Sequence, residues 1–410
     1  MTQRVVVTGV AGLTSLGDTW ARVREGLETG RSGVVYMTDW DAYEDLHTRL
    51  GAPVSDFVAP PHFGRKTRRS MGRVAVMAVA SAERAVANAG LTGAPVLADG
   101  RTGVAYGSST GSTDAVRDFG TVLMNHNLQG INSTTYLRMM AHTAAVNIAI
   151  YFGAKGRVVT TSSACTSGSQ GIGYGYEAIK FDRQDVMLAG GAEELCPTEA
   201  AVFDTLFATS TKNAAPTTTP RPFDVGRDGL VVGEGACTLV LESLVHAQAR
   251  GAPILAEVVG FGTNCDGEHA TRPNHETMRR AMELALADAG LVPEQIGYVN
   301  AHGTATQQGD IAESRATSEL FGARMPVSSL KGNFGHTMGA CGAIEAWLTI
   351  EMMNADWYAP TLNLEVIDER CGALDYLMGS GRTMSCEYVM NNNFAFGGIN
   401  TSLLFKRWVR

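Results

Sequence analysis

The sequence has few charged and few aromatic residues. Lys, Arg, Asp and Glu make up 18% of its 410 residues, and Phe, Trp and Tyr make up 7%. Disorder would require high charge with low hydrophobicity, whereas 45% of these residues are hydrophobic, so a disordered chain is excluded. The 47 glycines favour closely packed helices and sharp turns between strands and helices.

The chain also lacks a net positive charge, long apolar runs and an even number of cysteines. Its net charge is −8, which argues against nucleic acid as a partner. No apolar stretch is long enough to cross a bilayer, so we expect no membrane association. The seven cysteines are scattered, and the chain opens with a strand-like run in place of a secretory signal. We therefore expect a cytoplasmic protein with reduced thiols.

Short β-rich runs alternate with helical stretches of small residues, which is the pattern of an α/β fold. The predicted strands lie at Arg4–Thr8, Thr102–Tyr106, Val158–Thr161, Val186–Ala189 and Thr238–Leu241. The predicted helices lie near Thr19–Glu28, Ala75–Asn88 and Gly168–Phe181. A long ordered loop, rich in Pro, Thr, Asn and Asp, is expected at Thr209–Arg227, over the surface or the mouth of an active site.

The second half of the chain repeats features of the first. The run Ala85–Leu91 is echoed by Ala285–Leu291, and each copy closes a long helix at a glycine before a strand. Each half then carries a strand, a reactive residue (Cys165 or His336) and a helix of small residues. Although helices often end in Ala-x-Ala-Gly by chance, the matching order predicts two facing halves. Residues 1–252 would carry the cysteine and residues 253–410 two histidines.

Cys165 stands where a strand meets a helix. A β-rich run ends at Thr161, and a helix starts just beyond the cysteine. The free N–H groups and positive dipole end of a helix N-terminus favour the thiolate, which is the nucleophilic form. Gly168, Gly171 and Gly175 share one face of that helix and predict very close backbone packing. An arbitrary cysteine is more often an inert core thiol, but this setting favours a nucleophile.

Two histidines also follow glycine-rich junctions. His302 ends a strand-like run, and His336 follows a glycine turn at the start of another small-residue helix. Strand ends are where α/β folds present reactive groups. A helix N-terminus favours neutral imidazole, which can donate a hydrogen bond to an oxyanion. We expect Lys331 to pair with Glu313 and to organise the loop of His336. The alternative is two hydrogen-bonded core histidines.

Near the C-terminus, Asn391–Gly398 contains three asparagines, two phenylalanines and a Gly-Gly pair. This composition predicts a tight polar turn whose aromatic side chains guard a pocket. Its backbone amides, together with that of Cys165, would cradle an oxyanion. The alternative is a structural turn beside an edge strand.

Together these motifs resemble the β-ketoacyl-acyl-carrier-protein synthases I and II. The residues that carry the resemblance are Ser162–Cys165, His302–Thr304 with Thr306, Lys331 before Gly335-His336, Asn393–Gly398, Arg227–Gly229 and Gly233–Ala236. The resemblance covers nearly the whole chain. It implies a thiolase-like fold of five layers, α-β-α-β-α, built from two duplicated halves, and a homodimer.

The resemblance also implies a decarboxylative condensation in fatty acid elongation. An acyl chain from acyl carrier protein would be held as a thioester on Cys165 and joined to malonyl carrier protein, giving 3-ketoacyl carrier protein and carbon dioxide. His302 and His336 would promote decarboxylation, supported by Lys331 and Glu313. The amides of Cys165 and Phe396 would form the oxyanion hole, and no cofactor would be required.

Further roles follow from the same resemblance. Thr304 and Thr306 would bind the pantetheine arm, and Phe396, with Phe394 beside it, would gate the acyl pocket. The basic residues expected to dock the acidic carrier protein are Arg65, Lys66, Arg68, Arg69 and, less strongly, Lys212. A structural Na⁺ or K⁺ is expected at Asn300, Glu345, Asn391 and Asn392. Cys265, His269 and His275 lie in a polar loop without a second cysteine pair and do not predict zinc.

Three residues depart from the family pattern. Ala395 stands between the phenylalanines where glycine is usual, Thr166 follows the cysteine, and Gln307 replaces a usual proline. These changes leave room for an unusual acyl donor, so a discrete ketosynthase of polyketide or other specialised synthesis is one alternative. A non-catalytic partner subunit is another, although it would be expected to have lost Cys165. A thiolase acting on coenzyme A thioesters would be expected to use a second cysteine in place of the histidine pair.

Overall fold

One sheet of eleven strands organises the protein, whose structure is a computed structural model that describes residues 2–409. The strands run in the order β13-β11-β10-β15-β16-β9-β1-β8-β6-β4-β5. Those of the first half are β1 (Val5–Leu13), β4 (Thr102–Gly107), β5 (Val158–Thr161), β6 (Val186–Glu193) and β8 (Gly235–Ser243). Those of the second half are β9 (Ala256–Cys265), β10 (Ile296–Asn300), β11 (Pro326–Ser328), β13 (Asp375–Tyr376), β15 (Tyr388–Ala395) and β16 (Ile399–Arg407).

The two halves share one strand topology. In the first half, β4 pairs in parallel with β5 and β6, and β8 pairs antiparallel with β6 and β1. In the second, β10 pairs in parallel with β11 and β15, and β16 pairs antiparallel with β15 and β9. The halves join where β1 pairs with β9. The predicted duplication is confirmed. The boundary at residues 252 and 253 lies between α9 (Leu244–Ala249) and β9 and stays a prediction.

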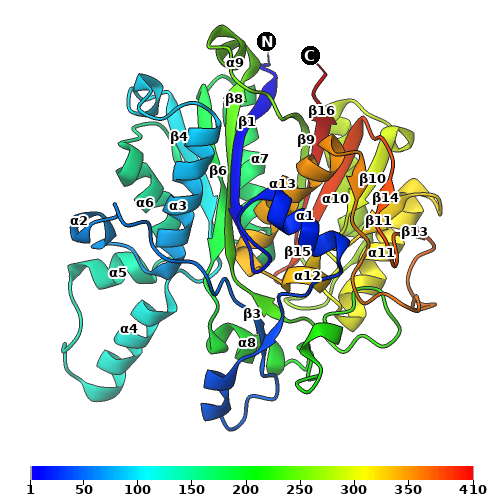
Figure 1. Ribbon diagram of the computed structural model, residues 1–410, viewed down its shortest axis with the longest axis horizontal. Helices are drawn as coiled ribbons and strands as arrows, with labels where there is room; N and C mark the ends of the chain where they lie inside the picture. Colours follow the sequence, from blue (N-terminus) through cyan, green and yellow to red (C-terminus); the bar gives the residue numbers. More distant parts are fainter. Residues whose placement is uncertain (1, 410) are drawn as a thin grey trace.

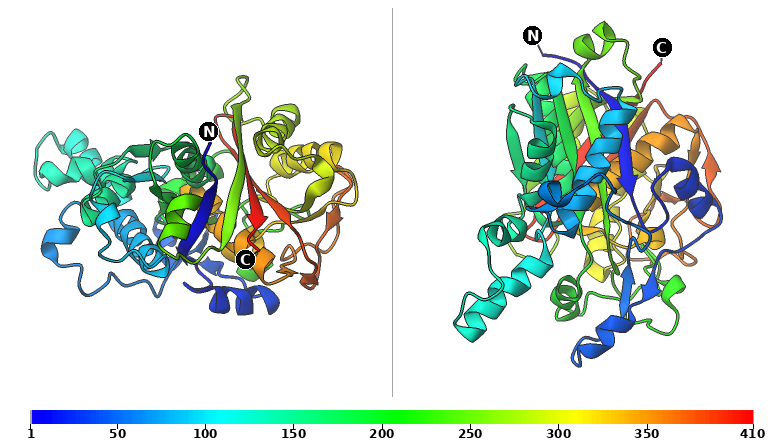
Figure 2. Two further views of the ribbon diagram at one scale, coloured as in Figure 1. Left: turned by 90° about the horizontal axis from the view of Figure 1, so that it is seen from above. Right: turned by 60° about the vertical axis from the view of Figure 1, so that its left-hand side comes forward.

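Helices cover both outer faces of the sheet and fill the space between its halves (Figures 1 and 2). The outer helices are α3 (Arg73–Asn88) and α6 (Thr143–Phe152) on the first half, and α10 (His275–Ala289) and α11 (Gln307–Phe321) on the second. Between the halves, α7 (Ser167–Lys180) and α13 (Cys341–Asn354) pack against each other and against β6, β8 and β15. This is the five-layered α-β-α-β-α fold that the sequence predicts.

The remaining elements are short and lie around this framework. The helices are α1 (Trp20–Glu28), α2 (Arg65–Arg68), α4 (Thr113–Asn125), α5 (Ser133–Met139), α8 (Pro197–Asp204) and α12 (Lys331–Phe334). Two small sheets contain β2 (Val35–Tyr36), β3 (Leu50–Ala52) and β7 (Val232–Gly233), and β12 (Trp357–Tyr358) and β14 (Arg382–Thr383). Helices α4 and α5, which the sequence analysis did not predict, form an arm that projects from the first half (Figure 1).

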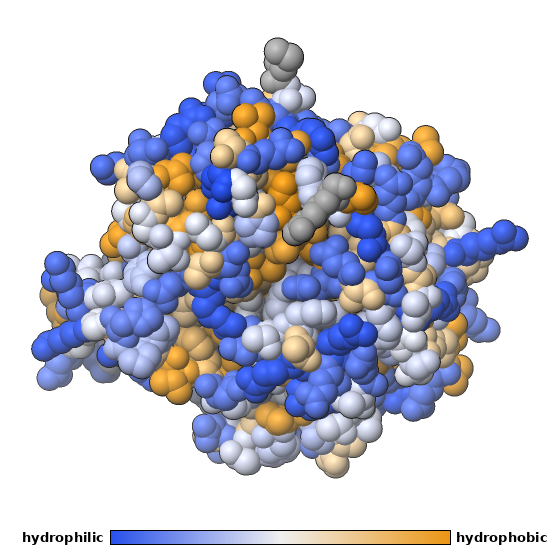
Figure 3. Space-filling view, turned by 45° about the horizontal axis from the view of Figure 1, so that its top comes forward, coloured by the Kyte–Doolittle hydropathy of each residue, from blue (hydrophilic) through white to orange (hydrophobic). Residues whose placement is uncertain are grey.

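Polar side chains cover most of one face of the molecule (Figure 3). No helix within residues 2–409 is both long and apolar enough to cross a lipid bilayer. Hydrophilic side chains predominate on the face shown in Figure 3, and apolar ones form small groups between them. On the α4–α5 arm, however, Leu123, Met124 and Leu128 are each at least 75% exposed.

The glycine face of α7 brings the reactive centre into the dry interior. A Cβ at Gly168 would lie 2.9 Å from the backbone nitrogen of Ala343 on α13. A Cβ at Gly171 would lie 2.7 Å from the carbonyl oxygens of Ala105 and Gly190, on two strands of the first half. Because only glycine allows these approaches, α7 packs directly on backbone at both faces, as the sequence predicts.

Gly171→Ala tests this packing. We expect the free energy of unfolding to fall by about 1–3 kcal/mol, because two backbone carbonyls cannot rotate away from the new methyl group. Gly120→Ala is the matched control, since Gly120 lies on α4 and a Cβ there meets no atom within 4 Å. This control is expected to gain up to ~1 kcal/mol from helix propensity. Denaturant unfolding measures both, and equal effects would contradict the proposed packing.

Candidate active site

Cys165 lies on a 3-10 turn, Ala164–Thr166, between β5 and α7, and its thiol is buried. Ala164 has a φ of 50°, in the left-handed region that residues with a Cβ rarely adopt, so the turn is sharp and locally strained. The Ser167 hydroxyl secures it by accepting from the Ser163 N–H at 3.0 Å and donating to the Ala164 carbonyl at 2.7 Å. The predicted position of the cysteine at a helix start is confirmed.

His336 lies beside the Cys165 thiol. It lies between α12 and the turn Met338–Ala340, and its Nε2 is 2.9 Å from the Sγ of Cys165. The backbone of His336 is held on both sides. Its backbone N–H donates to the Val231 carbonyl at 2.7 Å, and its backbone carbonyl accepts from the Gly233 N–H at 2.8 Å. Within residues 2–409, no group hydrogen-bonds its buried Nδ1.

His302 joins them from the end of β10. Its ring meets that of His336 edge to face, with 5.1 Å between centroids. Glu313 on α11 holds the His302 turn, because its two carboxylate oxygens accept the N–H groups of His302 and Gly303, each at 2.7 Å. The Nδ1 of His302 lies 3.4 Å from the side-chain nitrogen of Asn393. The structure thus brings both predicted histidines to the predicted cysteine.

The prediction that Lys331 pairs with Glu313 is wrong. The Lys331 ammonium donates instead to Glu345 on α13, and both side chains are buried. The second carboxylate oxygen of Glu345 accepts from Nδ2 of Asn393 at 2.7 Å. A buried ammonium requires a paired and hydrogen-bonded anion. Glu345 meets that need, whereas Glu313 is engaged with the backbone at His302.

Burial and the Lys331 charge set the protonation states. Burial, reinforced by Lys331, holds the pKa values of His302 and His336 well below their usual range, so both imidazoles are neutral at pH 7. Burial also raises the pKa of Cys165 to about 12, although Lys331 and the backbone N–H groups of Phe396 and Cys165 act in the opposite direction. The expected thiolate is therefore wrong for the free protein. A neutral thiol faces a neutral imidazole.

The asparagine- and glycine-rich segment forms the end of β15 and the tight turn into β16. The backbone N–H groups of Phe396 and Cys165 favour negative charge on the Cys165 sulfur and so act to lower its pKa. The φ angles of Gly397 and Gly398 are 86° and 73°, where glycine is favoured. The Phe396 ring packs against Phe203 with 5.1 Å between centroids. The prediction of one tight polar turn is right only for its end, because Asn391–Ala395 belong to strand β15 and the turn begins at Phe396.

A cavity of about 290 Å³ opens beside Cys165. Its lining includes His302, His336, Phe394, Phe396, Thr304, Thr306, Gln307 and Arg272. The hydroxyls of Thr304 and Thr306 lie 2.9 Å apart. The predicted threonine pair and both phenylalanines therefore share one cavity with the thiol. This lining suits a ligand that is apolar in one part and hydrogen-bonding in another.

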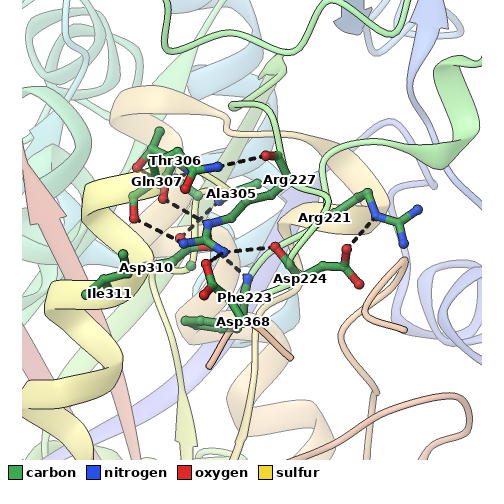
Figure 4. Close-up of polar contacts among 12 residues, drawn as sticks. Arg221, Phe223, Asp224, Arg227, Ala305, Thr306, Gln307, Asp310, Ile311 and Asp368 are labelled. Atoms are coloured by element: carbon green, nitrogen blue, oxygen red, sulfur yellow. Dashed lines mark hydrogen bonds and ion pairs between the residues drawn. The ribbon is translucent and has the colours of Figure 1, made fainter. Parts of the chain in front are cut away.

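A buried charge network holds the threonine turn (Figure 4). The Arg227 guanidinium donates to Asp368 at 2.7 Å and to the Gln307 carbonyl at 3.1 Å. Asp310 accepts the N–H of Ala305 at 3.1 Å and lies 3.5 Å from Arg227. Burial raises the pKa of Asp310 to about 6, opposed by Arg227. The network ties three segments together and fixes Ala305, whose φ of 65° lies in the left-handed region.

The predicted docking residues lie on the surface. Arg65, Lys66, Arg68 and Arg69 are exposed on and after α2, and none forms an ion pair within residues 2–409. The neighbouring Arg73 is engaged with Glu234. Lys212 donates to the Gly226 carbonyl at 2.8 Å and lies 3.6 Å from Asp228, so much of its charge is compensated.

The residues expected to hold a monovalent cation divide into two pairs. The side-chain oxygens of Asn300 and Asn391 are buried and lack a hydrogen-bond partner within the described chain. The oxygen of Asn392 accepts from Ser402 at 2.7 Å, and Glu345 is engaged with Lys331 and Asn393. Only Asn300 and Asn391 therefore offer free carbonyl oxygens, which are ligands that suit a hard cation.

Sequence reasoning missed two residues that organise the site. Asn393 appeared in a motif without a role, yet it links Glu345 to His302. Glu193, at the end of β6, accepts from the Ser108 hydroxyl at 2.8 Å and from the Gly339 N–H at 3.0 Å. It thereby connects the two halves beside the nucleophile. Its place at the end of an apolar strand was the one available signal.

Comparisons with known proteins agree with this geometry. The sequence profile "Beta-ketoacyl synthase, N-terminal domain" matches residues 2–247, and "Beta-ketoacyl synthase, C-terminal domain" matches residues 255–365. The 3-oxoacyl-[acyl-carrier-protein] synthase 2 of Synechocystis sp. is 37% identical over 99% of this chain and 98% of its own.

Two solved structures share the fold over the full length of both chains. A β-ketoacyl synthase from Burkholderia phymatum is 58% identical, with a TM-score of 0.98. The ishigamide ketosynthase/chain length factor is 31% identical, with a TM-score of 0.90.

The Lys331–Glu345 pair yields a testable coupling. Lys331→Met is expected to lower the free energy of unfolding by about 3–5 kcal/mol, because it leaves the Glu345 carboxylate buried without its cation. Lys331→Met combined with Glu345→Gln should lose less than the sum of the two single variants. Denaturant unfolding of the four proteins measures this coupling, and strictly additive losses would contradict the pairing.

Proposed function

The chain belongs to the β-ketoacyl synthase family, and we propose that it is a 3-oxoacyl-acyl-carrier-protein synthase whose nucleophile is Cys165. The observation that carries the proposal is the 2.9 Å contact between the Cys165 sulfur and Nε2 of His336. The backbone amides of Cys165 and Phe396, which favour negative charge on this sulfur, support it. The full-length similarity to a 3-oxoacyl synthase supports acyl carrier protein as the carrier of both substrates and fatty acid elongation as the role.

The first half-reaction would transfer an acyl group to Cys165. The sulfur attacks the thioester carbonyl of acyl carrier protein, and the Cys165 proton passes through Nε2 of His336 to the departing pantetheine thiolate. The tetrahedral oxyanion is stabilised by the N–H groups of Cys165 and Phe396. The products are the acyl-enzyme thioester and free carrier protein. Proton transfer accompanies attack because the resting thiol is neutral.

The second half-reaction would use both histidines as hydrogen-bond donors. The malonyl thioester loses carbon dioxide, and neutral His302 and His336 stabilise the resulting enolate oxygen. The enolate carbon attacks the acyl carbonyl on Cys165, whose amide again holds the oxyanion. This attack forms the new carbon–carbon bond, and collapse of the tetrahedral intermediate breaks the carbon–sulfur bond and releases the Cys165 thiolate, which takes up a proton from water. Thr304 and Thr306 would position the pantetheine arm, and Phe396 would gate the acyl pocket.

A second candidate is a discrete ketosynthase of polyketide synthesis, which the similarity to the ishigamide ketosynthase/chain length factor favours. A non-catalytic partner subunit is less well supported, because Cys165, His302 and His336 are all present and in contact. A thiolase is also less well supported, because the histidine pair lies against the nucleophile.

We further infer a homodimer. β5 is an edge strand of the sheet, and Val158 on it and Ile150 on the neighbouring α6 are exposed. The α4–α5 arm adds four exposed apolar side chains: Leu123, Met124, Leu128 and Tyr136. A second copy would cover this surface and the open strand edge. Sedimentation at several concentrations would detect a monomer if this inference is wrong.

Three smaller proposals concern the ion, the compartment and the boundary between the two halves. Asn300 and Asn391 would hold a structural Na⁺ or K⁺ through their unpartnered oxygens, and elemental analysis of dialysed protein tests this. The ion would stabilise the turn from β15, and no catalytic step requires it.

All seven cysteines are free, which supports a reducing, cytoplasmic location. The division at residues 252 and 253 is proposed as the boundary of the two halves.

Intact-mass spectrometry with acyl carrier proteins tests the condensing mechanism. The wild-type protein should gain one acyl group, and malonyl carrier protein should discharge it as a 3-keto product. Cys165→Ala should gain none. His302→Ala should still load, because His336 remains beside the sulfur, but its discharge should slow by about 10²-fold or more. Condensation that survives in Cys165→Ala would sink the proposal.

Charge reversal on α2 tests carrier docking. The double variant Lys66→Glu, Arg69→Glu should raise KM for acyl carrier protein about tenfold at low salt, with a smaller effect at high salt. Loading from a free acyl-pantetheine thioester should be unchanged, since that donor has no protein surface. An equal defect with both donors would show that these residues do not act through the carrier.

A further inference from the structure

Arg272 lies on the rim of the cavity that contains the reactive thiol. It belongs to the loop between β9 and α10, and it lines the same cavity as Cys165, Thr304 and Thr306. Among the described residues that line this cavity, it is the one lysine or arginine. Its side chain is exposed. A single fixed positive charge therefore lies where a ligand would enter.

The loop around Arg272 is held in place by its own hydrogen bonds. The N–H groups of Thr271 and Arg272 donate to Nδ1 of His269 at 3.1 and 3.2 Å. The Ala270 carbonyl accepts from the Gly397 N–H at 2.7 Å. The backbone that carries Arg272 is thus joined to the turn that supplies the second oxyanion amide.

The acidic groups that share this cavity have other partners. Asp266 accepts from Nδ2 of Asn400 at 2.7 Å and from the Thr277 hydroxyl. Asp228 accepts from Ser210 at 3.0 Å and lies 3.6 Å from the ammonium of Lys212. Glu313 is engaged with backbone. Within residues 2–409, no carboxylate lies within ion-pair distance of Arg272, so its guanidinium is free to bind an anion.

We propose that Arg272 binds the phosphate of the phosphopantetheine arm, an inference that rests on the proposed function. The planar guanidinium fork matches a phosphate in two parallel hydrogen bonds. The malonyl carboxylate is a poor alternative, because a cation bound to it would stabilise the group that must leave as carbon dioxide. The exposed rim position suits the charged end of the arm, while the neutral thiol and histidines lie in the buried part.

A pair of donors that differ by one phosphate tests this assignment. Hexanoyl-pantetheine and hexanoyl-4′-phosphopantetheine are each incubated with the wild-type protein and with Arg272→Gln, and acylation of Cys165 is followed by intact mass. We expect Arg272→Gln to lower kcat/KM for the phosphorylated donor about tenfold and to leave the other donor within about twofold. Arg272→Lys, which keeps the charge without the fork, should fall between.

Arg183→Gln is the control, because Arg183 is exposed and does not line the cavity. It should leave both donors unchanged. Equal losses on both donors in Arg272→Gln would overturn the phosphate assignment and indicate a role in cavity shape. Hexanoyl acyl carrier protein serves as a third donor, and a loss seen only with it would also overturn the assignment, in favour of contact with the carrier surface. Failure of the wild-type protein to load from any donor would instead overturn the proposed function itself.

Discussion

The buried ion pair between Lys331 and Glu345 is the interaction on which the site depends. An ammonium in a dry interior is tolerated only with a close anion, and this anion comes from the central helix α13. The same ammonium, together with burial, keeps the pKa values of His302 and His336 low. Asn393 then connects the pair to His302. Burial and this ion pair thus act together on the protonation of the reactive centre, and the pair also helps to hold its shape.

Duplication explains how these groups converge. Cys165 follows β5 and His336 follows β11, which are corresponding strands of the two halves. His302 follows β10, and Ser108 follows the corresponding β4. Because the halves face each other across α7 and α13, the strand ends of one oppose those of the other. Glu193, at the end of β6, bridges them by holding Ser108 and the start of the loop after His336.

Local signals predicted the strands, the turn of Cys165 and both histidines. These features could be recognised because the patterns of small residues, glycines and apolar runs that indicate them span only a few neighbouring positions. Contacts that depend on side-chain direction were not predictable. Nothing local shows that Lys331 turns toward Glu345 while Glu313 accepts backbone N–H groups. The expected Cys165 thiolate failed for a similar reason, since the sequence revealed the helix start but not the depth of burial that outweighs it. The α4–α5 arm went unpredicted.

A neutral thiol beside neutral imidazoles has a chemical consequence. Burial raises the pKa of Cys165 to about 12, so little free thiolate exists to be trapped by oxidants. Nucleophilicity must then arise as the proton leaves during attack, which the contact with His336 permits. Within residues 2–409, the buried cations Lys331 and Arg227 are both paired, the first with Glu345 and the second with Asp310 and Asp368. A carboxylate brought there gains no strong counter-charge, which favours its loss as carbon dioxide. Positive charge free to bind an anion lies outside, at Arg272, where binding does not oppose the chemistry.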